Sequence, residues 1–114
     1  MEFHKAMVVA VGMAELAHRN GHYEFTAVCA RKIAEMYVAI VVSGEYWSLQ
    51  EGLSMMPHDM DTVLWDALKS AQHIGNSGAH ARAERMSIED GDRALSAACI
   101  IAVAYLAKVR RARL

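Results

Sequence analysis

Asn76 and His80 are the residues of this chain whose types and spacing could do chemistry. They stand four positions apart, so a helix would project both side chains from one face. An asparagine amide donates and accepts hydrogen bonds, and a histidine ring titrates near neutral pH. The pair could hold a phosphate, contact the backbone of a partner, or bind each other. An ordered helix junction is the simpler interpretation, and we predict that both residues are structural anchors first.

The surrounding stretch, residues 72–80, interrupts an otherwise helix-rich sequence with two glycines, Gly75 and Gly78. Glycine weakens a helix, but it also permits a neighbouring helix to approach very closely. Packing alone could therefore account for both glycines.

The elements that position this stretch are predicted to be helices. The 114 residues fit one domain, 1–114, and a hydrophobic fraction of 54% with a single proline favours close-packed helices. We predict an all-α fold, a small up-and-down bundle of four main helices. Because so small a domain cannot bury all this apolar surface alone, a homo-oligomer is expected, with residues 94–107 in its interface.

Helix boundaries follow from apolar spacing and stop signals. The first helix is expected over residues 3–19 and the second over 23–43, with Asn20-Gly21 between them. Asp59 is the expected N-cap of the third helix, and Ser87-Ile88-Glu89-Asp90 resembles a capping box for the last. In the last helix one apolar stripe comprises Ile88, Leu95, Ala98, Ala102, Tyr105 and Val109, and Ile100, Ile101, Val103 and Ala104 fall outside it. Its middle turns are therefore apolar nearly all round, and the helix is expected to be central or at a subunit interface.

Residues 44–58 form the longest irregular connection, with one turn of helix expected around residues 48–53. The segment is too apolar for a solvated loop. We interpret it as a lid over the core, and the alternative is a contact surface rich in methionine and aromatic side chains.

The net charge of −1 gives no general attraction to nucleic acid or to an anionic membrane. A basic cluster near the C-terminus comprises Lys108, Arg110, Arg111 and Arg113. It could complement the helix dipole or bind an anion. An adaptor that binds nucleic acid would have to use this cluster. The longest uncharged run there is too short to span a bilayer. Nucleic acid is therefore not the favoured partner, and no membrane association is expected.

Cys29 and Cys99 lack CxxC spacing, and no secretory leader is recognisable, so both are expected to be buried free thiols in the cytoplasm. His18 and His22 could face a metal together, but the Asn-Gly break separates them and no carboxylate or cysteine completes a ligand set. We expect neither a metal nor a cofactor.

Two segments resemble an uncharacterised bacterial domain often appended to restriction endonucleases. That domain has an ARK-x-x-E helix, as in residues 27–35 here, then an IGN-x-x-AH turn, as in residues 74–80, and a final helix. It is similar in turn to the HEPN superfamily of helical bundles, which includes metal-independent ribonucleases of defence and toxin systems.

The resemblance to catalytic HEPN proteins depends on which residue stands directly before Asn76. Catalytic HEPN proteins use arginine, usually asparagine, three further residues and then histidine, commonly across a dimer. Matching Asn76 and His80 to that pattern places Gly75 where the arginine belongs, and glycine brings no charge to a phosphate. Arg82 or Arg85 could substitute from nearby.

We therefore expect a non-catalytic helical interaction module with Gly75, Asn76 and His80 as binding residues. It would be dimeric, would bind a protein partner, and would act in a bacterial or phage defence-related system. The alternative is a metal-independent endoribonuclease with a displaced arginine, using His80, Asn76 and Arg82.

Overall fold

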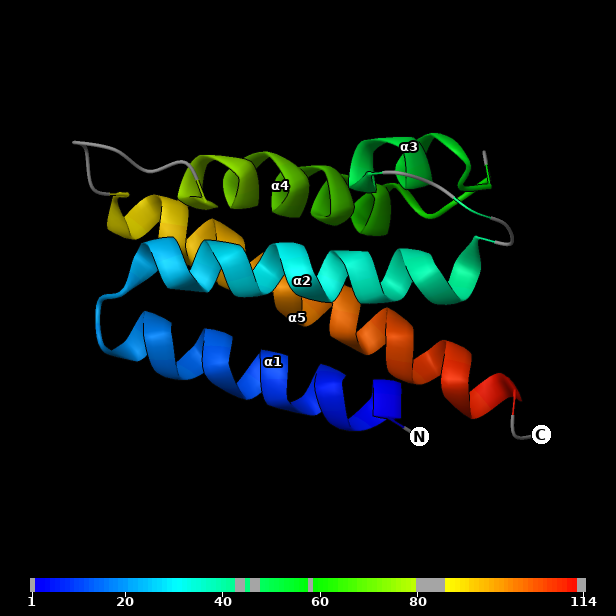
Figure 1. Cartoon of the computed structure of the whole chain (residues 1–114), viewed down its shortest axis with the longest axis horizontal. Coiled ribbons are helices and arrows are strands. Elements are labelled where there is room, and N and C mark those ends of the chain that lie inside the picture. The colour runs from blue at the N-terminus through cyan, green and yellow to red at the C-terminus, as the bar shows by residue number, and fades with distance from the viewer. Residues whose placement is uncertain (1, 43–44, 46–47, 58, 80–85, 113–114) are drawn as a thin grey trace.

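The computed structural model describes residues 2–42, 45, 48–57, 59–79 and 86–112. These residues form helices and no strand. The helices are α1 (Glu2–Arg19), α2 (Tyr23–Val41), α3 (Leu49–Ser54), α4 (Thr62–Ala79) and α5 (Ile88–Ala112) (Figure 1). The predicted all-α bundle of four main helices is confirmed, and the short α3 is the turn of helix expected around residues 48–53.

Helix α2 is the centre of the bundle, because it contacts each of the other four helices. Figure 1 shows α1 and α4 on either side of α2, with α5 crossing behind it. The bundle measures 44 × 25 × 24 Å. Side chains on α2 are therefore the ones that can meet residues from several distant parts of the sequence.

The first connection ends α1 where the Asn-Gly signal predicted. Gly21 has a φ of 76°, a left-handed conformation that side chains with a Cβ rarely adopt. The amide of His22 donates to the carbonyl of Ala17 at 2.8 Å, which satisfies a backbone group at the helix end. The chain can then reverse into α2 within three residues.

The capping box at α5 is confirmed. The Asp90 amide donates to Ser87 Oγ at 3.2 Å, and the Ser87 amide donates to Asp90 Oδ2 at 3.3 Å. These reciprocal bonds satisfy donors that the first turn of the helix leaves unpaired.

The cap predicted for α4 is wrong by two residues. Helix α4 begins at Thr62, and Asp61, not Asp59, accepts a hydrogen bond from the Leu64 amide at 3.2 Å. An N-cap side chain reaches the amide three positions ahead, so only the aspartate directly before the first helical residue can serve.

The core face of α5 shares Ala98 and Tyr105 with the apolar stripe of the sequence but is otherwise different. Ile101, which was placed outside that stripe, is fully buried, whereas Ile88 is 54% exposed. The buried residues are Gly91, Ala94, Ala97, Ala98, Ile101 and Tyr105. An apolar helix offers several stripes of similar hydrophobicity, and the position of α2 selects which one is covered.

The segment before α4 packs as a lid. Ser48 caps α3, since its Oγ accepts from the Glu51 amide at 3.2 Å. Leu49, Leu53 and Met56 are buried against the core, as a lid requires. Met55 stays 44% exposed, so a small apolar surface remains outside.

Candidate functional site at the α2–α4 contact

The stretch that carries Asn76 lies inside a helix. Residues 72–79 continue α4, so the expected interruption is wrong. Glycine costs about 1 kcal/mol of helix propensity relative to alanine, and the tertiary contacts of α4 outweigh this cost.

At Gly75, α2 and α4 approach too closely for a side chain to fit between them. A Cβ added to Gly75 would overlap the Cβ of Arg31 and would lie 3.1 Å from the carbonyl oxygen of Ala27. Both contacts come from the α2 backbone or the atom attached to it, which cannot move independently of the helix. Of the two explanations for this glycine, close helix packing is the one that the geometry supports.

Asn76 is held from across this contact by an arginine. The Arg31 Nη1 group donates to Asn76 Oδ1, and Arg31 Nε donates to Glu35 Oε1 at 3.2 Å. Asn76 is exposed, and the Arg31 side chain is 32% exposed. We call Arg31, Glu35 and Asn76 the polar latch, because their bonds join α2 to α4 at the edge of the Gly75 contact.

The polar latch contains the hydrogen-bond donors of an anion-binding site but lacks the net positive charge of such a site. Arginine binds phosphate through several N–H donors and its positive charge. Here Nε donates to a carboxylate and Nη1 donates to an amide oxygen. The Glu35 carboxylate would repel a phosphate, so the geometry supports a structural bond more strongly than a ligand site.

The other residues of the predicted site cannot be placed beside the latch. His80, Arg82 and Arg85 lie outside the described residues. Arg31 is the residue that sequence reasoning missed at this site. The signal that could have found its ion pair with Glu35 is their four-residue spacing on one helix. Its bond to Asn76, 45 positions away, depends on the close approach at Gly75.

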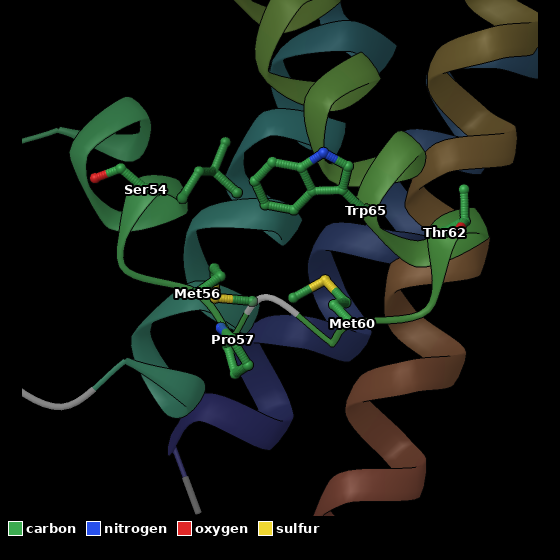
Figure 2. A pocket seen from close by; sticks show the side chains of 7 residues that line it. Ser54, Met56, Pro57, Met60, Thr62 and Trp65 are labelled. Atoms are coloured by element: carbon green, nitrogen blue, oxygen red, sulfur yellow. The ribbon is translucent and has the colours of Figure 1, made fainter.

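A separate pocket lies between the lid and α4 (Figure 2). It has a volume of about 430 Å³, and Figure 2 shows Trp65 together with Met56 and Met60 around it. Its lining residues are Leu53, Ser54, Met56, Pro57, Met60, Thr62 and Trp65. Among these described lining residues, none has a side chain that is ionisable near neutral pH, so they supply the pocket with no general acid or base.

The basic end of α5 faces another hollow, of about 540 Å³, with Lys108, Arg111 and Tyr37 in its lining. Burial raises the pKa of Tyr37, and the Arg111 guanidinium offsets part of this rise. Asp59 also lines the hollow and reduces its positive character. The arrangement is consistent with dipole compensation at the end of the helix.

His18 is engaged by groups other than a metal. Its Nε2 lies 2.6 Å from Asp92 Oδ1, and its ring meets the ring of Tyr23 edge-on at 5.6 Å. Within the described ranges, no group of three or more histidine, cysteine, aspartate or glutamate side chains is placed to hold a metal ion.

The two cysteines differ. Cys29 is buried, as predicted, and burial raises the pKa of its thiol. Cys99 is exposed on α5, so the prediction that both are buried is wrong for this residue. It belongs to a line of exposed residues along α5 that we call the outer stripe: Asp92, Ser96, Cys99, Val103, Leu106 and Arg110.

The outer stripe is apolar in its centre. Val103 is 66% exposed and Leu106 is 44% exposed. A groove of about 500 Å³ runs beside them, lined mainly by apolar residues that include Leu64 of α4 and Ile100 and Ala107 of α5. This continuous surface is typical of a contact between proteins.

Comparisons of the chain with family models, curated proteins and solved structures find no match. Across the part of the chain that the structure describes, no helix combines the length and the apolar character that crossing a membrane requires.

Proposed function

We propose that the chain is a non-catalytic helical interaction module that works as a homodimer. The observation that carries this proposal is the apolar centre of the outer stripe on α5, with Val103 the most exposed of the large apolar side chains described. Burying apolar surface contributes roughly 25 cal/mol per Å², so leaving such a surface in water is unfavourable. A second copy of the chain covers it in this proposal.

The polar latch supports the non-catalytic part. Metal-independent RNA cleavage needs a base, an acid and positive charge at the phosphate. Gly75 supplies no charge, and Arg31 already bonds to Glu35 and Asn76. The defence-related setting and the further protein partner rest on the motif resemblance alone, and they remain part of the proposal on that basis.

Light scattering at tens of micromolar tests the dimer, since an interface with a Kd of about 1 μM would be filled at that concentration. We expect a dimer for the parent protein and a monomer for Val103→Asp. Val8→Asp is the matched control, because Val8 on α1 is 57% exposed and receives the same charge. A monomeric parent, or equal effects of both variants, would contradict the proposal.

One observation favours a second candidate function. Arg31 places a guanidinium beside Asn76, so a ribonuclease with a displaced arginine would have Arg31 as that arginine. The assay is incubation of mixed RNA with the protein in EDTA from neutral to mildly alkaline pH. We expect no cleavage. Cleavage that disappears in both His80→Ala and Arg31→Met would replace the interaction module with this enzyme.

A further inference from the structure

The outer stripe lies opposite the buried face of α5. With 3.6 residues per turn, its six positions fall within about 40° of one line along the helix, and Ile101 points about 180° away from that line. All six stripe residues are exposed, and Ile101 is fully buried. The spacing alternates between four and three residues, which is the spacing of a seam between two packed helices.

The ends of α5 carry opposite charges. Glu89 and Asp90 lie in its first turn, and Arg110 and Arg111 lie in its last. Residues 88–93 contain three acidic side chains and one basic side chain, whereas residues 108–111 contain three basic side chains. Two parallel α5 helices would place like charges together at both ends. Two antiparallel helices would place acidic beside basic ends, and their dipoles would also oppose each other favourably.

The stripe fits an antiparallel pair in one register. Its members stand two, five and nine positions on either side of Ile101. The two-fold axis of such a pair would cross the interface between the two α5 helices at the level of residue 101. Asp92 then faces Arg110 of the second copy, Ser96 faces Leu106, and Cys99 faces Val103. Each contact then occurs twice, as a two-fold symmetric interface requires.

Building on the proposed dimer, we infer that two copies of the chain pair through their outer stripes in this antiparallel register. The apolar residues of the stripe form the middle of the interface, and the Asp92–Arg110 pairs close its ends. Leu64 and Ile100, which line the groove beside the stripe, widen the contact toward α4. The partner that covers the outer stripe is a second copy of the chain, because the acidic and basic ends that complement each other belong to the same helix, α5.

Reversing charges tests the ends of this interface. Asp92→Arg and Arg110→Asp should each weaken dimerisation about tenfold, since each places two like-charged pairs in the dimer, and the double variant should recover most of that loss. Asp92 Oδ1 also lies 2.6 Å from His18 Nε2 of the same copy, so circular dichroism first checks that Asp92→Arg is folded, and Arg110→Asp leaves that contact intact. Arg111→Asp is the matched control, because it makes the same charge change about 100° around the helix. Sedimentation at several concentrations measures the dissociation constants. Equal weakening by the control, or no recovery in the double variant, would contradict the pairing.

Cross-linking distinguishes the register from the dimer itself. Two proteins are made in a Cys99→Ala background, one with Ser96→Cys and an affinity tag, the other with Leu106→Cys. In the antiparallel register the two Ser96 positions are about 15 Å apart along the axis, whereas Ser96 and Leu106 of different copies are adjacent. Circular dichroism first confirms that both variants are folded, and Cys99→Ala alone controls for the buried Cys29.

We expect a short thiol cross-linker to join the two proteins when they are mixed and to leave each one unlinked when alone. Linking of the Ser96→Cys protein to itself would show a parallel pair, and the register would be wrong while the proposed dimer stands. A dimer by light scattering with no cross-link in the mixture would place the interface elsewhere and overturn the inference. A monomer at every concentration would overturn both the inference and the proposed function.

Discussion

The α2–α4 contact and the outer stripe of α5 differ in what their small and apolar residues face: another helix at the contact, and solvent along the stripe. At the α2–α4 contact, Gly75 removes a side chain so that two helix backbones approach, and a polar latch closes the edge. Along α5, Val103 and Leu106 extend into solvent without a described neighbour to cover them. Apolar content alone therefore does not show which surface is core. The difference predicts that substitutions at the first region lower the stability of the fold, whereas substitutions at the second leave stability nearly unchanged and weaken dimerisation.

Gly75→Ala should have the largest effect on stability. The new Cβ would overlap Arg31 and press on the carbonyl of Ala27, so the helices would have to separate. Overpacking of this kind costs about 1–3 kcal/mol, which is a fall of roughly 10 °C in Tm for a domain of this size. Thermal unfolding followed by circular dichroism measures the change.

Gly12→Ala is the control for that variant. Gly12 is also inside a helix, but nothing lies within 4 Å of a Cβ added there. The control should gain about 0.5–1 kcal/mol from better helix propensity. If Gly75→Ala were as stable as Gly12→Ala, close packing would not be the reason for Gly75.

Gly91→Ala should have a smaller effect. A Cβ at Gly91 would overlap the ring of Tyr23, with Cγ at 2.8 Å and Cε1 at 3.0 Å. This neighbour is a side chain, and its ring can rotate away, so we expect a loss of about 1 kcal/mol. Chemical denaturation of Gly91→Ala, Tyr23→Ala and the double variant measures the coupling between them. Strictly additive losses would show that the two groups do not meet.

Asn76→Ala should cost still less, because the residue is exposed. It removes the bond from Arg31, and a hydrogen bond to a charged group at the surface contributes about 1 kcal/mol or less. Combining Asn76→Ala with Arg31→Met in a double-mutant cycle isolates that bond. A variant that melts like the parent protein but loses a binding partner would assign Asn76 to function and not to structure.

Thiol labelling should distinguish the outer stripe from the core of the bundle without any change in stability. Cys99 is exposed and lies on the outer stripe, so it should react rapidly in dilute protein and more slowly as dimerisation covers it. Cys29 is buried and has a raised pKa, so little of the reactive thiolate forms and it should react only on unfolding. Mass spectrometry identifies the labelled site. Fast labelling of Cys29 in folded protein would contradict its place in the core.

Much of the fold could be predicted from local patterns. The Asn-Gly turn, the capping box and the lid were predictable because each depends on residues within a few positions of one another. The cap of α4 was misplaced because Asp59 and Asp61 carry the same side chain and differ only in where the helix begins. The core face of α5 was misjudged because Ile101 lies in a helix that is apolar around much of its circumference.

The sequence by itself determined most of the helical segments and that Gly75 could serve a close helix approach, because propensity, spacing and caps act along the chain. Only the tertiary structure decided that Arg31 bonds to Asn76, that residues 72–79 continue α4, and that Cys99 faces outward. Each of these depends on where one helix lies relative to another. That placement follows from the packing of all the helices around α2, and no local pattern contains it.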